Sequence, residues 1–247
     1  MTIGVIGLGE VGTAIIKLCK QKHRVYGRNR SIDQIKGKII DVLHICFGYS
    51  DVLIPTVVKA IKELRPKLVI IDATVKPGTT QEIYKKTKVP IVHAPIIGKH
   101  PQLYKYLFEM PKIIGAVNDK SYRMAKKHFE ELGLKTVRFS SPLESELGKL
   151  LCTTYYGWNI IFEKFVHRVC KQLGADPKQV YRQFNEVYNK GYARTLPHVR
   201  RPILKHVSGE IGGHCVIPNA RILQHWFKDE FTAFLLSQNE KAKKDSA

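Results

Sequence analysis

Short apolar runs and longer amphipathic segments alternate along the first part of the chain. The apolar runs predict β-strands at residues 3–6, 23–26, 42–47, 68–71, 91–93, 112–115 and 136–139. Helical spacing of apolar positions predicts helices at residues 13–19, 54–64, 79–85 and 119–132. Strands that alternate with helices are typical of a doubly wound α/β fold. The pattern therefore predicts one α/β domain over residues 1–141.

A single long helix is predicted at residues 144–173. No proline interrupts this segment, and its apolar residues recur at helical spacing. Such a helix is longer than one small domain requires, and its apolar face carries Tyr155, Tyr156 and Trp158. We therefore expect a second, small and mainly helical domain over residues 142–247, and a homodimer that buries the long helix.

The amino-acid composition limits the classes of protein to which this chain can belong. Of the 247 residues, 44% are hydrophobic and 25% are charged, which is enough to build one substantial core or two unequal ones. There is no run of eighteen apolar residues, and the N-terminus reads as a strand rather than as an export signal. The five cysteines have no paired spacing, which predicts neither a disulfide framework nor a structural metal site. We expect a cytoplasmic protein without a membrane span.

The net charge of +20 is unusual for a chain of this length. It indicates either a polyanionic partner or small anionic ligands. Because the basic residues are spread along the chain without an aromatic-interleaved nucleic-acid module, nucleic acid is the less favoured partner. An acid-free basic segment at residues 192–206 and the loop after residue 95 are the places where an anionic substrate would bind. The candidate substrate contacts are Lys99, His100, Arg194, Arg200, Arg201 and His214.

A glycine fingerprint follows the first predicted strand directly. Gly7, Gly9 and Gly12 have the spacing G-x-G-x-x-G and lead into a predicted helix, which is the order that a dinucleotide-binding turn requires. Gly7 would allow the tight turn, Gly9 the approach of a pyrophosphate, and Gly12 the packing of helix on strand. The predicted cofactor contacts are Gly7, Leu8, Gly9, Glu10, Val11 and Gly12. The first domain is therefore predicted to be Rossmann-like.

The residues after the second predicted strand indicate which dinucleotide would bind. Where an enzyme that uses NAD usually has an acid for the ribose hydroxyls, this chain has Arg28, Asn29, Arg30 and Ser31. Two guanidinium groups and a hydroxyl would suit the 2′-phosphate of NADP. A solvated turn with incidental charge is the alternative. We predict NADP as the cofactor, with NAD as the alternative.

Three further places in the sequence are candidates for catalytic residues or ligand contacts. Paired glycines crowd the backbone before Cys215, which would suit a nucleophilic thiol, although a small buried residue in a tight loop is the plainer interpretation. Glu146 and Lys149 stand three residues apart on the long helix and, taken alone, read as a surface ion pair. Thr74 follows a strand, at the edge where α/β sheets bind ligands, and is either a ligand contact or a helix-capping hydroxyl.

The order of these motifs resembles the UDP-glucose/GDP-mannose dehydrogenase family over most of residues 1–220. The resemblance rests on the glycine fingerprint, Thr-Val-x-Pro-Gly-Thr, Glu-Ser-Glu-Leu-x-Lys, Leu-Gly-Ala-Asp and Gly-Gly-His-Cys, of which the last is the most specific. In that family a nicotinamide cofactor oxidises a sugar alcohol twice, through a thiohemiacetal and a thioester on the cysteine. The resemblance implies that Cys215 is the nucleophile, that Lys149 stabilises an oxyanion, and that Thr74 positions water and substrate.

The chain departs from the family at positions that serve hydrolysis. Thr153 stands where the family usually has Asn, Asn219 where it has Asp, and Ile96 where it has a Glu. Thr153 and Asn219 remain candidate catalytic residues. The family's third domain, which closes over the nucleotide, is also expected to be missing. Because hydrolysis of a thioester needs an activated water, these departures weaken the second oxidation more than the first.

Two other functions stay open. A β-hydroxyacid or 6-phosphogluconate-type dehydrogenase shares the plan of a Rossmann domain and a helix lysine, but needs no cysteine. A non-catalytic cofactor-binding or nucleic-acid-binding homologue is suggested by the net charge and by the lost acids. The preferred hypothesis is a nicotinamide-dependent dehydrogenase that acts on an anionic sugar-nucleotide or phosphorylated substrate.

Overall fold

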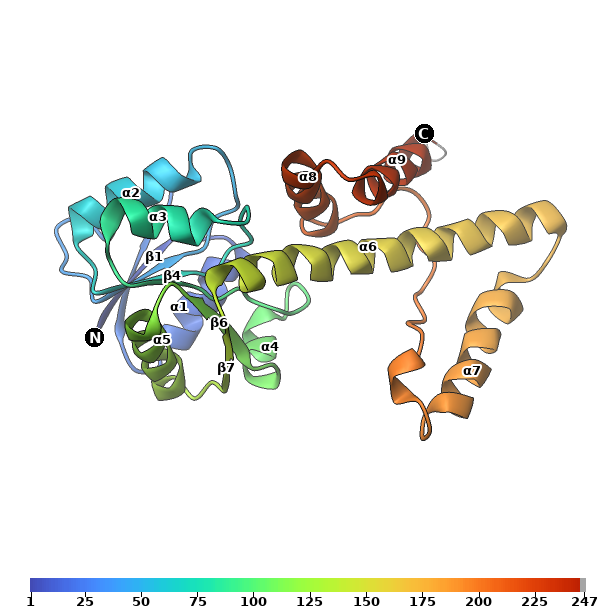
Figure 1. The fold of residues 1–247 in the computed structure, drawn as a ribbon, viewed down its shortest axis with the longest axis horizontal. Helices are drawn as coiled ribbons and strands as arrows, with labels where there is room; N and C mark the ends of the chain where they lie inside the picture. Colours follow the sequence, from blue (N-terminus) through green and yellow to red (C-terminus); the bar gives the residue numbers. More distant parts are fainter. Residues whose placement is uncertain (245–247) are drawn as a thin grey trace. The chain divides into compact units, whose positions relative to one another are not determined.

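The computed structural model describes residues 1–244 (Figure 1). The chain divides into two compact units, one over Met1–Lys149 and the other from Leu150 onward. That these units serve as a cofactor-binding domain and a catalytic-cysteine domain remains a prediction. Each unit is built around its own apolar core.

The first unit contains a seven-stranded sheet. Its strands are β1 Thr2–Ile6, β2 Arg24–Arg28, β3 Val42–Ile45, β4 Leu68–Ile71, β5 Ile91–His93, β6 Lys112–Ala116 and β7 Thr136–Phe139. The order is β2-β1-β3-β4-β5-β6-β7, and every neighbouring pair is parallel except β5 and β6. All seven strands were predicted from the apolar runs. The α/β fold class is confirmed.

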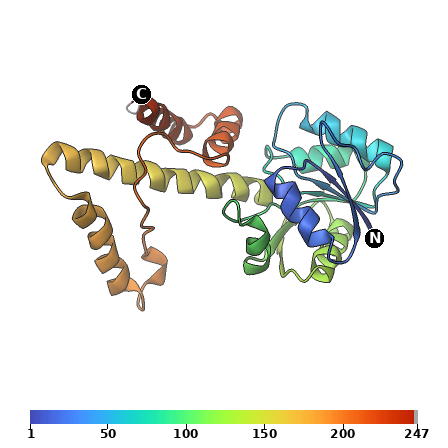
Figure 2. The ribbon, with the colours of Figure 1, turned by 180° about the vertical axis from the view of Figure 1, so that it is seen from behind.

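Helices cover both faces of this sheet (Figures 1 and 2). One face packs against α1 Glu10–Cys19, α4 Leu103–Glu109 and α5 Asp119–Glu131, and the other against α2 Leu53–Leu64 and α3 Thr79–Thr87. Strands buried on both faces need apolar side chains in both directions, which explains their nearly continuous Val, Leu and Ile runs. The sequence pattern missed α4, because a helix of seven residues is too short to show a clear period.

The sheet reverses its direction of growth at β1. The chain passes from β1 to β2 on one side and then to β3 on the other, so the carboxyl ends of β1 and β3 border a topological switch point. Open α/β sheets bind their ligands at this place. The glycine loop, residues 7–12, follows β1 directly and starts at this switch point.

The second unit is helical. The 32-residue helix α6 Pro142–Leu173 starts in the first unit and ends where Gly174 takes the left-handed conformation, with φ +66°. A π-helical segment η1 Lys178–Gln183, α7 Phe184–Tyr192, a 3₁₀ turn η2 Pro197–Val199, α8 Val216–Phe227 and α9 Glu230–Lys244 follow. The predicted long helix and helical C-terminal part are confirmed. Among the helices of residues 1–244, none combines the length and the apolar character needed to cross a bilayer.

Trp158 belongs to the core of the second unit. Its ring stacks on Phe231 at 4.1 Å and on Phe234 at 5.5 Å between centroids, both from α9. It also packs against the buried cluster around Leu235. Trp158 is nevertheless only half-buried, and the expectation that its face of the long helix meets a second subunit remains a prediction.

Candidate functional site

The glycine loop has the geometry that its spacing predicts. Gly7 has φ +97°, and a Cβ there would lie 2.7 Å from the backbone nitrogen of Phe47. A Cβ at Gly12 would lie 1.8 Å from the carbonyl oxygen of Gly7, so α1 can pack on β1 only with glycine at this position. At Gly9, by contrast, a Cβ would meet no atom within 4 Å. The open backbone at Gly9, beside the N-terminus of α1, fits the phosphates of a dinucleotide.

His100 lies at the rim of this loop. It forms an ion pair with Glu10, in the first turn of α1, although the two residues are far apart in the sequence. Lys99 is exposed next to it. The structure thus brings His100, a predicted substrate contact, to the predicted cofactor loop of the same unit. Their binding roles remain predictions.

Arg28 is engaged by carboxylates of the chain itself. Its guanidinium donates to Asp33 Oδ1 at 2.9 Å and to the two carboxylate oxygens of Glu63 at 2.6 and 3.1 Å. Hydrogen bonding to Arg28 lowers the pKa of both carboxyl groups below their ordinary values. The predicted contact with a 2′-phosphate requires the guanidinium groups of both Arg28 and Arg30 to be available. This expectation needs correction for Arg28, whose guanidinium already binds two carboxylates. Sequence reasoning missed Glu63 because it lies on α2, 35 residues away.

The other residues that were predicted to contact the 2′-phosphate are exposed. Arg30 and Ser31 are open to solvent in the turn after β2. Asn29 shapes this turn, because its Oδ1 accepts the backbone N–H groups of Ser31 at 2.9 Å and Ile32 at 2.8 Å. Any preference for NADP would therefore depend on Arg30 and Ser31.

Glu146 caps a helix and does not lie on the surface. Its carboxylate accepts the backbone N–H of Gly78 at 2.6 Å, and the backbone N–H and the hydroxyl of Thr80 at 2.9 and 2.6 Å. The residue is fully buried, and burial raises the pKa of its carboxyl group. The interpretation of Glu146 and Lys149 as a surface ion pair is therefore wrong. Because Glu146 satisfies the N-terminus of α3, Thr74 is not needed as its cap.

Lys149 contacts the loop at Ile96, where the sequence departs from the family pattern. Its Nζ donates to the backbone carbonyl of Ile96 at 2.9 Å, and the lysine is half-buried. The Ile96 side chain is buried and apolar, so this loop offers Lys149 a carbonyl oxygen rather than a carboxylate. Thr74, half-buried after β4, belongs to the same unit.

Cys215 stands at the N-terminus of α8. It is the N-cap residue, it is half-buried, and the preceding Gly213 has φ +82°. The backbone N–H of Asn219 donates to the Cys215 carbonyl at 3.0 Å, which begins the helix. The partial positive charge of a helix N-terminus stabilises a thiolate. His214 is exposed beside it.

Two of the departures from the family contact each other. The side-chain amide of Asn219 donates to the hydroxyl of Thr153 at 3.1 Å, and that hydroxyl donates to the Leu150 carbonyl at 2.9 Å. Both side chains thus have hydrogen-bond partners, and neither group is acidic. This pair can orient α8 on α6, but it cannot take a proton from water.

Gly157 sets how closely α8 approaches α6. A Cβ at this position would lie 2.6 Å from Val216 Cγ1 and 3.0 Å from Leu235 Cδ1. Val216 is the residue after Cys215, so the missing side chain at Gly157 fixes the position of the helix start that carries the thiol. The sequence offered no signal for this contact, because an isolated glycine in a helix does not reveal its neighbour.

The predicted arginine contacts differ in the partners that the structure gives them. The Arg201 guanidinium stacks 3.7 Å from the ring centre of Tyr188 and donates to Asn185 Oδ1 at 3.3 Å. Arg201 therefore helps to hold the segment after α7. Arg194 and Arg200 are exposed.

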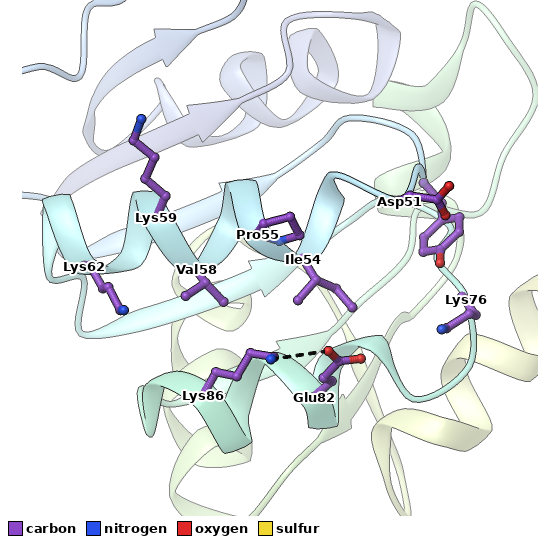
Figure 3. Close-up of a pocket in the computed structure, with 10 residues that line it drawn as sticks. Asp51, Ile54, Pro55, Val58, Lys59, Lys62, Lys76, Glu82 and Lys86 are labelled. Atoms are coloured by element: carbon purple, nitrogen blue, oxygen red, sulfur yellow. Dashed lines mark ion pairs between the residues drawn. The ribbon is translucent and has the colours of Figure 1, made fainter.

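An open groove of about 870 Å³ lies elsewhere, between α2 and α3 (Figure 3). Lys59, Lys62, Lys76 and Lys86 line it together with two carboxylates, one of which, Glu82, pairs with Lys86 at 3.7 Å. None of the site residues predicted from the sequence lines this groove. Its lysines account for part of the positive charge of the first unit.

Comparison with known proteins finds similarity to dehydrogenases. No model of a protein family matches the chain. It is 31% identical to the UDP-N-acetyl-D-mannosamine dehydrogenase of Methanocaldococcus jannaschii over 167 residues, which are 64% of this chain and 36% of that protein. The chain thus spans about a third of the length of this curated relative.

Solved structures agree on the fold. The UDP-D-ManNAc dehydrogenase of Pyrococcus horikoshii matches with a TM-score of 0.80 at 21% identity, over 98% of this chain and 69% of that one. The 3-hydroxyisobutyrate dehydrogenase of Mycobacterium tuberculosis matches with a TM-score of 0.68 at 14% identity, over 99% of this chain and 94% of that one. At these identities the likeness shows the fold alone.

The contact at Gly157 gives a test of how the thiol is positioned. We expect Gly157→Val to lower the free energy of unfolding by about 1–3 kcal/mol, because the new side chain overlaps Val216. Displacement of the α8 start should also change the rate at which Cys215 is alkylated. Chemical denaturation and mass spectrometry of alkylated peptides measure the two effects.

The matched control is Gly191→Val on α7, where a Cβ would meet no atom within 4 Å. This control should leave both stability and alkylation nearly unchanged. Equal effects from the two substitutions would contradict the assigned role of Gly157.

Proposed function

The chain is related to the nucleotide-sugar dehydrogenases, and we propose that it is a nicotinamide-dependent oxidoreductase that oxidises an alcohol of an anionic sugar substrate. The observation that carries this proposal is Cys215 at the N-terminus of α8, within the Gly-Gly-His-Cys segment that the family shares. The similarity to a UDP-N-acetyl-D-mannosamine dehydrogenase supports a sugar nucleotide as the substrate class.

The glycine loop would hold the dinucleotide. Gly7, Gly9 and Gly12 leave the backbone at the start of α1 open to a pyrophosphate, and the helix N-terminus favours its negative charge. A bound nicotinamide ring supplies the acceptor for hydride. Arg30 and Ser31 would contact a ribose 2′-phosphate, which is the basis on which we still propose NADP over NAD.

Cys215 and Lys149 have complementary roles in the proposed reaction. After the first oxidation, the Cys215 thiolate attacks the aldehyde carbon, a C–S bond forms, and the carbonyl oxygen becomes an oxyanion. The Lys149 ammonium stabilises this oxyanion and can give it a proton, which yields a thiohemiacetal. A second hydride would pass from that carbon to a second oxidised dinucleotide, while the hydroxyl proton returns to Lys149, and this leaves a thioester. Water then releases the acid and returns the thiol, with Thr74 helping to position the water.

A two-electron reaction is the second candidate. The observation that favours it is the uncharged pair of Asn219 and Thr153, together with the apolar Ile96. These residues stand where the family has groups that assist hydrolysis, so the last step has weaker support than hydride transfer. In this case the chain would act as a β-hydroxyacid-type dehydrogenase, without a covalent intermediate on Cys215.

We also propose that the chain forms a homodimer through α6. Large apolar side chains on this helix remain exposed in the second unit, including Tyr155 at 66% and Phe162 at 56% of their full exposure. Phe231 and Phe234 of α9 are exposed as well and stack on Trp158. An aromatic surface of this kind is typical of a protein–protein contact.

The role of the thiol predicts a change in product. Cys215→Ser should abolish formation of the acid but preserve a reversible, cofactor-linked step at the alcohol, because that step needs no C–S bond. A screen of sugar nucleotides and phosphorylated hydroxy acids, followed at the nicotinamide absorbance band, would identify the substrate. The ratio of reduced cofactor to product then separates two-electron from four-electron oxidation.

Cys152→Ser is the matched control, since Cys152 is an exposed cysteine of the second unit, on α6. It should behave like the unaltered protein. Acid formation by Cys215→Ser would exclude the thioester route. A single hydride per substrate in the unaltered protein would favour the β-hydroxyacid-type reaction, and the absence of turnover with every substrate class would favour a non-catalytic role.

Cofactor choice is tested at Arg30. We expect NADP to bind about tenfold more tightly than NAD, which corresponds to about 1.4 kcal/mol from one charge-assisted phosphate contact. Arg30→Ala should remove this difference and leave NAD binding unchanged. Isothermal titration calorimetry with both dinucleotides measures it.

Arg24→Ala, at the opposite end of β2, is the control and should retain the preference. Equal affinities in the unaltered protein, or tighter binding of NAD, would refute the choice of NADP.

The dimer is tested at Phe162. Phe162→Glu should weaken self-association by about 100-fold or more, because a charge cannot be buried in an aromatic contact without a partner. Light scattering at micromolar concentration reports the oligomeric state. Phe184→Glu on α7, where the phenylalanine is 65% exposed, is the control and should remain dimeric. A monomeric unaltered protein would contradict the proposal.

A further inference from the structure

Five polar side chains lie inside the apolar core of the first unit. They are Cys19 at the end of α1, His44 on β3, Asp72 after β4, Lys112 on β6 and His128 on α5. All five are at most 3% exposed. Polar groups at such depth need partners, so their mutual arrangement is informative.

Asp72 anchors the group. Its Oδ1 accepts a hydrogen bond from Lys112 Nζ at 2.8 Å, and its Oδ2 lies 2.7 Å from His44 Nδ1. The carboxylate thus favours the His44 tautomer that carries its proton on Nδ1. In that tautomer the lone pair of His44 Nε2 points away from Asp72.

Two imidazoles and a thiol converge on the far side of His44. The Nε2 atoms of His44 and His128 lie 3.1 Å apart, and their rings are tilted by 48°. The Cys19 sulfur and a ring nitrogen from each histidine lie within 4.8 Å of one another. Zinc held by two imidazoles at about 2.0–2.1 Å in a tetrahedral arrangement would place their nitrogens about 3.3 Å apart. The observed separation is close to that value.

We propose that Cys19, His44 and His128 form a buried binding site for a divalent transition metal, with zinc as the best fit. One thiolate and two imidazoles are a ligand set that zinc prefers. Asp72 would be the second partner of a metal-bound imidazole, an arrangement that fixes the ring and raises its basicity as a ligand. The metal would tie α1, β3 and α5 together and stabilise the unit.

The charges in the core are compatible with such an ion. With zinc bound, the two charges of the ion and the charge of Lys112 would face the Cys19 thiolate and the Asp72 carboxylate, which leaves one positive charge for a further anionic ligand to offset. The fourth position of a tetrahedral ion is left for water or for Cys46, whose sulfur lies 3.8 Å from Asp72 Oδ2.

A second group of possible ligands has a different geometry. Glu163, His167 and His206 also converge, in the second unit, but both imidazoles direct Nδ1 at the carboxylate, at 2.9 and 3.1 Å. Their rings stack 3.7 Å apart and are within 18° of parallel. A metal must lie in the plane of each imidazole that binds it, which stacked rings do not allow. This group is better explained as a hydrogen-bonded carboxylate, and it supplies a control.

The metal content of the 247-residue chain tests the proposal. The protein is purified under reducing conditions without a chelator, and zinc is measured by mass spectrometry. We expect about one zinc per chain in the unaltered protein, and less than about a tenth of that in Cys19→Ser and in His128→Gln. His206→Gln should keep its zinc. None of these measurements depends on dehydrogenase activity.

Cobalt substitution provides a second readout that needs no variant to fold. Cobalt added to the chelator-treated, unaltered protein should give the intense absorption of a tetrahedral ion and a thiolate-to-cobalt charge-transfer band. Zinc should also raise its unfolding temperature, as any ligand that binds only the native state does. Failure to bind either metal would overturn the proposal, as would zinc that persists in both core variants or disappears only in His206→Gln. Loss of zinc in Cys46→Ser as well would extend the ligand set to four.

Discussion

The parallel sheet of the first unit is buried on both faces, and this constraint determines most of what surrounds it. Parallel strands need crossover connections, so helices must cover the sheet on both sides. The reversal at β1 then places the carboxyl ends of β1 and β3 at the switch point, where the backbone of Gly9 stays open. The same burial makes an unpaired polar group in the core costly. His44, Asp72 and Lys112 accordingly satisfy one another rather than water.

Close backbone approach is the second organising feature, and glycine provides it in both units. At Gly12 the helix α1 touches the turn at Gly7, and at Gly157 the helix α8 rests against α6. In each case the contact positions a helix N-terminus, which carries a partial positive charge. One N-terminus adjoins the predicted phosphate site, and the other bears Cys215. The proposed cofactor and the proposed nucleophile therefore depend on the same physical device.

The neutral pair of Asn219 and Thr153 stands where the proposed hydrolysis would need an ionisable group. Each of the two residues departs from the family pattern when taken singly, yet together they form a satisfied hydrogen bond between α8 and α6. Such a pair keeps the helices in place without an ionisable group. This arrangement holds the helix start that carries Cys215 in place, but it offers no base to the proposed hydrolysis.

The sequence by itself determined the α/β class, the seven strands, the long helix and the glycine turn, because these depend on periodicity and on backbone conformation, which are local properties. It also carried the relationship to the nucleotide-sugar dehydrogenases, through short motifs in a fixed order. Only the tertiary structure decided which side chains meet. Glu63 engages Arg28, Glu146 caps α3 from another helix, and Cys19, His44 and His128 converge from three separate elements. These contacts join residues 25 to 109 positions apart, a separation at which no local pattern constrains the geometry.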